Sequence, residues 1–162
     1  MKRSIFLLIA ILSINQSSLA QTDSFDIFSY HTPEFFTRSI LPSMVQFSYK
    51  ENDTTFCIIT IYKSQKSQLD TLKDLMAQWN EYVVKPLSRA SKKPGRIMGG
   101  QLQEGWGSSI AIGNFYQNKK KCVVILSSFR KDNTTACTVY AFSNKISKGP
   151  VENFSQNLHL KK

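Results

Sequence analysis

The sequence predicts a single α+β domain, in which an antiparallel sheet is covered by helices. One observation is an apolar strand followed directly by an amphipathic helix, over residues 55–87. Another is a succession of four strand-like segments joined by short turns, over residues 96–143, which is typical of an antiparallel meander. The predicted order is three strands, a helix, a four-strand meander and a second helix, and this order belongs to the α+β class.

The first twenty residues have the organisation of a secretory signal peptide. Residues 1–3 are basic at two positions, and residues 4–14 form an apolar run. Ser18-Leu19-Ala20 then supplies small residues at the two positions that a signal peptidase reads. This pattern predicts cleavage between Ala20 and Gln21. The alternative is an uncleaved anchor, but the run is shorter than the ~20 residues that a spanning helix needs. We therefore expect residues 21–162 to form an exported domain, periplasmic or extracellular, with no stable membrane insertion.

Three strands are predicted before the helix, over residues 25–30, 44–50 and 56–62. Residues 35–36, both phenylalanine, are expected in a turn that closes one end of the core. Residues 51–54 have turn chemistry and predict a hairpin between the second and third strands. The third strand is apolar on both alternating faces, which predicts a central position with both faces covered.

The first helix is predicted within residues 67–87, where apolar residues recur at helical spacing and are expected to face the sheet. Ser67 and Asp70 resemble a capping box, and Pro86 marks the end of the helix. Asp70 and Asp74 are expected to be solvated charges near the helix start. The apolar stripe comprises Leu69, Leu72, Met76, Trp79, Val83 and Leu87.

Four strands and a second helix are predicted for the rest of the chain. Residues 150–160 favour a short helix, with Val151, Phe154 and Leu158 on its apolar side. The predicted strands of the meander cover residues 96–103, 106–117, 121–129 and 135–143.

The cysteines Cys57, Cys122 and Cys137 all lie in apolar strand patterns, where cysteine commonly behaves as a small buried hydrophobe. A hairpin turn centred on residues 132–133 places Cys137 opposite Ser128. Cys122 then lies roughly 20 Å further along at ~3.3 Å per residue, which is beyond the reach of a disulfide. A bond from Cys57 to either of the other two stays open.

Residues typical of catalytic and metal sites are few. His31 and His159 form no metal-binding spacing with a cysteine or with each other. Cys57 with His31 offers a nucleophile and a base, but Cys57 is expected to be buried. Residues 105–109 lack the order of a nucleophile elbow, and no phosphate-binding glycine loop occurs. We therefore expect no enzyme, no metal and no cofactor, with a small hydrolase as the second alternative.

Positive charge is the most informative surface feature of the sequence. The chain carries a formal net charge of +10, and alternate turns of a meander fall at the same end of the sheet. Lysines and arginines near alternate turns should therefore gather at one end. They predict a basic rim able to hold a polyphosphate, an acidic glycan or a nucleic-acid backbone. The alternative is that these side chains only keep turns soluble and sheet edges unpaired. The candidate anion-binding rim comprises Arg89, Lys92, Lys93, Arg96, Lys119, Lys120, Lys121, Lys145 and Lys148.

Three segments carry a resemblance to a known family: Thr32-Pro33 after an aromatic strand, the strand over residues 57–63 with the helix that follows it, and Gly105-Trp106 before a glycine-bearing strand. That helix contains Trp79 and ends in Val84-Lys85-Pro86. Over most of residues 25–160 the chain resembles a family of small exported domains from Bacteroidetes-type bacteria. It departs from that family after Pro33, where it has Glu-Phe-Phe in place of Gly-Trp.

The order of elements is also similar to the PsbP-like fold of photosystem accessory proteins and of a Ran-binding nuclear import factor. Members of that fold mostly act as binding or assembly modules, although a fold does not fix a function. The resemblance implies an exported, non-enzymatic binding or accessory module whose partner is a protein or an anionic polymer. The first alternative is an anion-binding protein that uses the basic rim.

Overall fold

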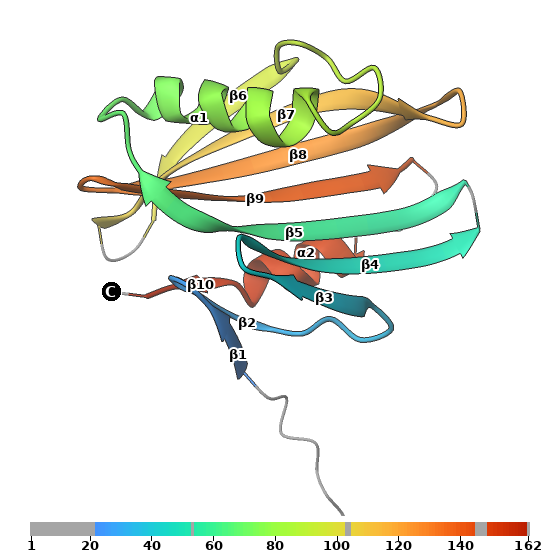
Figure 1. Cartoon of the computed structure of the whole chain (residues 1–162), viewed down its shortest axis with the longest axis horizontal. Helices are drawn as coiled ribbons and strands as arrows, with labels where there is room; N and C mark the ends of the chain where they lie inside the picture. Colours follow the sequence, from blue (N-terminus) through green and yellow to red (C-terminus); the bar gives the residue numbers. More distant parts are fainter. Residues whose placement is uncertain (1–21, 53, 103–104, 145–148, 162) are drawn as a thin grey trace, which may run out of the picture.

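Figure 1 shows the computed structural model, which describes residues 22–52, 54–102, 105–144 and 149–161. The predicted leader, its cleavage site at Ala20 and Gln21, and the rim residues Lys145 and Lys148 lie outside the described residues. None of the helices in the described part is long and apolar enough to cross a membrane. In chain order the elements are β1 (Thr22–Phe25), β2 (Phe28–His31), β3 (Thr37–Leu41), β4 (Met44–Asn52), β5 (Thr55–Lys66), α1 (Thr71–Trp79), the π-helical turn η1 (Asn80–Val84), β6 (Arg96–Gln101), β7 (Gly107–Gln117), β8 (Lys120–Lys131), β9 (Thr134–Ser143), α2 (Gly149–Gln156) and β10 (His159–Leu160).

The strands form two antiparallel sheets. The large sheet has seven strands in the order β3-β4-β5-β9-β8-β7-β6, and the small sheet has the order β1-β2-β10. Helix α1 lies across one face of the large sheet, whereas α2 and the small sheet lie on the other face (Figure 1). The large sheet therefore has a different cover on each side.

The predicted α+β, PsbP-like fold class is wrong, because the described chain is mostly β structure arranged in two antiparallel sheets. Residues 22–41, predicted to give one strand and a turn, form β1, β2 and β3. Asp26 has φ 54°, and this left-handed residue lets β1 fold back on β2. Strands β6 to β9 pair in succession, but they belong to the seven-stranded sheet and do not form a separate meander.

The expected turn at Phe35 and Phe36 is only partly correct. Phe35 has φ 64° and is 88% exposed, so it does not close the core. Phe36 packs partly buried against the core, with its ring 5.7 Å from the Tyr49 ring. The chain then continues as the edge strand β3, which was not predicted because its residues do not alternate between apolar and polar.

Strand β5 has the predicted central position. Cys57, Ile59 and Ile61 pack into the core beneath α2, while Phe56 and its alternating neighbours pack into the core beneath α1. The predicted hairpin with β4 is confirmed by pairing from Met44↔Tyr62 to Asn52↔Thr55. The period-two pattern of this segment was sufficient to predict both features.

The predicted apolar stripe of the first helix is only partly correct. Trp79 and Val83 are buried on the sheet as expected. Leu69 and Leu72 are 63% and 56% exposed, and Leu75 takes their place on the buried face. Trp79 and Val83 fit a buried face that begins with either Leu72 or Leu75. The polar contacts at the start of the helix select the face with Leu75.

Asp74 determines which face of α1 packs on the sheet. It is 2% exposed, so the expectation of a solvated charge was wrong. Its carboxylate accepts a hydrogen bond from the Ser67 hydroxyl at 2.5 Å and another from the Gln68 backbone N–H at 2.7 Å. Asp70 is the N-cap and accepts from the Lys73 N–H at 2.7 Å. The predicted Ser67–Asp70 capping box is therefore replaced by two separate caps.

The second helix is shorter than predicted. Val151 and Phe154 are buried as expected, but α2 ends at Gln156. The chain then pairs with β2 through β10, and the Lys161 N–H donates to the Ile27 carbonyl at 2.8 Å. This C-terminal segment, residues 157–161, crosses back over the large sheet (Figure 1).

Candidate functional site

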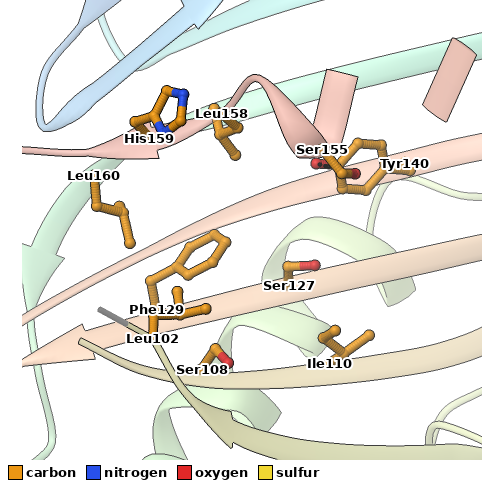
Figure 2. Close-up of a pocket in the computed structure, with 10 residues that line it drawn as sticks. All are labelled: Leu102, Ser108, Ile110, Ser127, Phe129, Tyr140, Ser155, Leu158, His159 and Leu160. Atoms are coloured by element: carbon orange, nitrogen blue, oxygen red, sulfur yellow. Dashed lines mark hydrogen bonds between the residues drawn. The ribbon is translucent and has the colours of Figure 1, made fainter. Parts of the chain in front are cut away.

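A cavity of about 540 Å³ lies between the large sheet and the C-terminal segment (Figure 2). Strands β7, β8 and β9 provide one wall, and the end of α2 with β10 provides the other. The lining residues are Leu102, Ser108, Ile110, Ser127, Phe129, Tyr140, Ser155, Leu158, His159 and Leu160.

The cavity exists because α2 covers only part of its face of the sheet. The Phe154 ring of α2 contacts the rings of Phe47 and Tyr140, with centroids 5.4 Å and 6.3 Å away. These contacts place α2 over β4 and β9. On the same face of β7, Ile110 and Ile112 stay half-buried. We call the face of β6, β7 and β8 that carries Ile110 and Ile112 the open face.

The cavity carries hydroxyl groups on both walls. Ser155 Oγ lies 3.3 Å from Tyr140 Oη and 2.8 Å from the carbonyl oxygen of Val151. On the sheet side, the Ser108 hydroxyl donates to the Gly100 carbonyl at 3.3 Å. Ser127 of β8 adds a further hydroxyl to the same wall. Burial raises the pKa of Tyr140, so this phenol stays protonated.

His159 lies at the rim of the cavity and does not complete a catalytic group. Leu158 and Leu160 pack against the core, so alternation along β10 turns His159 to the opposite side. Figure 2 shows its ring directed away from Ser127 and Ser108. The side chains drawn there include no carboxylate and no thiol. Among the described residues, no cluster of His, Cys, Asp and Glu has the arrangement of a metal site.

The three cysteines are free and buried. The register places Cys137 opposite Ser128 and Cys122 opposite Ser143, which confirms that these two thiols are too far apart to pair. Cys57 packs on the other face of the sheet from both. The structure thus answers the question that the sequence left open, since Cys57 has neither of the other cysteines within bonding reach.

The buried thiols are expected to be unreactive in the native protein. Burial raises the pKa of Cys57 to about 12 and raises those of Cys122 and Cys137 in the same direction. Because the thiolate is the nucleophile, modification by 5,5′-dithiobis-(2-nitrobenzoate) at pH 8 should be about a hundredfold slower than at an exposed cysteine. The comparison is with Ser39→Cys, which adds a thiol on the exposed strand β3. Denaturant should release all three native thiols, whereas rapid native labelling of Cys57 would contradict the assignment.

The described members of the predicted basic rim lie at one end of β7 and along the adjoining half of its edge. The loop before β6 is held along the edge of β7, since the Tyr116 N–H donates to the Ser88 carbonyl at 3.0 Å and the Ser91 N–H to the Asn114 carbonyl at 2.9 Å. This loop contains Arg89, Lys92 and Lys93. The β7–β8 turn at the same end contains Lys119 and Lys120.

Two rim residues differ from the rest, because they lie on the open face. Arg96 pairs with Ile112, and Lys121 pairs with Tyr116. Ile112 and Tyr116 share the face of Ile110, which lines the cavity. Two predicted cationic residues therefore lie on the same surface as a cavity that was not predicted from the sequence.

No protein-family model matches the chain, and no curated protein matches it. Among solved structures, the chain is similar to a crystal structure from Bacteroides thetaiotaomicron VPI-5482, with a TM-score of 0.51 and 13% sequence identity. The match covers 84% of this chain and 46% of that chain, so this chain spans about half of its length. At this identity the likeness shows the fold alone. It agrees with the Bacteroidetes-type resemblance and gives no support to the PsbP-like one.

Proposed function

We propose that the protein is an exported, non-enzymatic binding module that holds an apolar or amphiphilic ligand between its open face and its C-terminal segment. The observation that carries this proposal is the cavity of about 540 Å³. Small-molecule sites typically enclose roughly 300–1,000 Å³ and combine apolar walls with a few polar groups. Export rests on the signal-peptide pattern of residues 1–20.

The chemistry of the walls supports a binding role. Half of the lining consists of apolar side chains from both walls, and a ligand gains by removing its own apolar surface from water there. The hydroxyls of Ser127, Tyr140 and Ser155 supply directional hydrogen bonds to a polar group on the ligand. Such an arrangement orients a ligand without requiring a nucleophile or a general base.

A second candidate is an anion-binding protein that uses the basic rim. It is favoured by the hydrogen bonds that hold the loop of residues 88–95 along β7, beside the lysines of the β7–β8 turn. A polyanion on this rim would be held by charge alone, and its affinity would fall steeply with salt. The cavity has no part in that function.

The binding proposal is tested with Ser108→Phe, which places a ring in the cavity from β7. The uncharged fluorescent dye N-phenyl-1-naphthylamine should bind the native protein saturably with one site per chain. We expect Ser108→Phe to weaken this binding about tenfold or more, which corresponds to about 1.4 kcal/mol. The matched control is Ser39→Phe, which makes the same change on the exposed strand β3.

The control should bind the dye like the native protein, and circular dichroism should show the same fold for both variants. Equal dye binding by Ser108→Phe and Ser39→Phe would place the dye elsewhere and overturn the assignment of the cavity. No saturable binding by the native protein would overturn it as well.

A further inference from the structure

The apolar surface of the cavity continues beyond the lining residues along the open face. Ile112 follows Ile110 on β7, and Val123 and Ile125 lie on the same face of β8, all half-buried. Met98 of β6 lies opposite Ile110. We call this surface the apolar track. It leads from the cavity toward the β7–β8 turn.

Two cations border the apolar track, Arg96 beside its middle and Lys121 at its far end. Arg96 lies opposite Ile112, and Lys121 lies opposite Tyr116, so both cations share the face of the track. Both are exposed, and neither forms an ion pair within the part of the chain that the structure describes. Strands β6 to β9 contain no aspartate or glutamate at all. The positive charge of Arg96 and Lys121 is therefore not neutralised by these four strands.

The length of the track limits what can occupy it. From Ser108 at the cavity to Tyr116 beside Lys121, the strand extends roughly 26 Å at ~3.3 Å per residue. An extended single hydrocarbon chain fits this dimension, whereas a compact aromatic ligand would fill the cavity and leave the track and its cations unused. Arg96 lies two residues from Met98 on the same face of β6, so the carboxylate of a shorter chain can reach it.

We infer that the ligand is a free single-chain anionic amphiphile of the fatty-acid class, with its hydrocarbon chain along the apolar track into the cavity and its carboxylate at Arg96 for a shorter chain or at Lys121 for a longer one. This inference rests on the proposed function and specifies its ligand. The guanidinium of Arg96 can hold a carboxylate through two parallel hydrogen bonds. The apolar wall is a recess beneath the C-terminal segment, which favours one free molecule over the surface of a membrane.

The test compares dodecanoate with 1-dodecanol as competitors of N-phenyl-1-naphthylamine, both below their aggregation limits. The native protein should bind dodecanoate at least about tenfold more tightly than the alcohol, and added salt should reduce this preference. The double variant Arg96→Gln/Lys121→Gln should lose the preference and keep the dye affinity of the native protein. The control Lys92→Gln/Lys93→Gln removes the same charge from the loop beside β7 and should keep the preference.

The outcomes separate this inference from the proposed function. Equal displacement by acid and alcohol, with the dye still bound, would overturn the inference and leave the binding module in place. Absence of dye binding to the native protein would overturn both. Co-sedimentation with vesicles of phosphatidylglycerol and phosphatidylcholine, without binding of free dodecanoate, would overturn the inference in favour of a membrane surface.

Discussion

Replacement of Gly113 by alanine is expected to lower the free energy of unfolding by about 1–3 kcal/mol, as for other overpacked cores. A Cβ atom at this position would lie 2.7 Å from Cη2 and 2.8 Å from Cζ2 of Trp79. The indole cannot easily withdraw, because it is fully buried and its Nε1–H donates to the Ser91 carbonyl at 3.0 Å. Either the ring or strand β7 must move, and α1 moves with the ring.

The measurement is urea unfolding of single and double variants. Trp79→Phe removes both atoms that the new Cβ would meet, although it leaves a cavity and is itself destabilising by about 1–3 kcal/mol. Gly113→Ala should then cost less in the Trp79→Phe background than in the native one, with a coupling of about 0.5–3 kcal/mol. Additive effects would show that the contact is not the cause.

Gly99→Ala is the matched control on β6. Its nearest heavy atom would be the Ser108 carbonyl oxygen at 3.8 Å, which is an ordinary contact. We expect its effect on the free energy of unfolding to stay within about 0.5 kcal/mol. A loss equal to that of Gly113→Ala would indicate a general effect of removing glycine from this sheet.

The sequence predicted the features that depend on local periodicity. Strand β5, its hairpin with β4 and the separation of Cys122 from Cys137 all follow from alternation along a strand and from the position of a turn. These features need no knowledge of distant segments. For the same reason, six of the seven strands in the large sheet were predicted, five of them to within two residues of their observed bounds.

The fold class was mispredicted where short strands gain their stability from partners far along the chain. β1 and β2 have four residues each, and β10 completes their sheet from the C-terminus. A strand of that length has too few residues to show a pattern. The left-handed Asp26 between β1 and β2 was the available signal, since Asp tolerates that conformation in turns.

The candidate site was missed for a related reason. Its two walls come from segments as far apart as Ser108 and Leu160, and the cavity depends on how the C-terminal segment crosses the sheet. The charges of Arg96 and Lys121 were visible in the sequence, but their common face depends on the register between β6 and β7. Along residues 108–116, the positions on the open face include both polar and apolar residues. This mixture was the sequence signal that the open face is only partly covered.

Replacement of Asp74 by alanine is expected to lower the free energy of unfolding by about 2–4 kcal/mol, since it leaves two donors without their charged acceptor. The Ser67 hydroxyl and the Gln68 N–H both donate to this carboxylate, and Ser67 is itself only 6% exposed. These bonds fix the turn that joins β5 to α1. Their loss should weaken the packing of α1 on the sheet.

Asp70→Ala is the control, because Asp70 is exposed and caps the same helix through one backbone N–H. Its expected cost is about 1 kcal/mol, and the denaturant dependence of both variants should match that of the native protein. Asp74→Asn should fall between them, since its amide retains one acceptor oxygen and the Ser67 hydroxyl can reorient to accept. A larger loss from Asp70→Ala than from Asp74→Ala would restore the solvated-charge interpretation of Asp74. It would also show that Asp74 does not determine which face of α1 packs on the sheet. Within the described chain, no other polar group on the buried face of α1 bonds to residues 67 and 68.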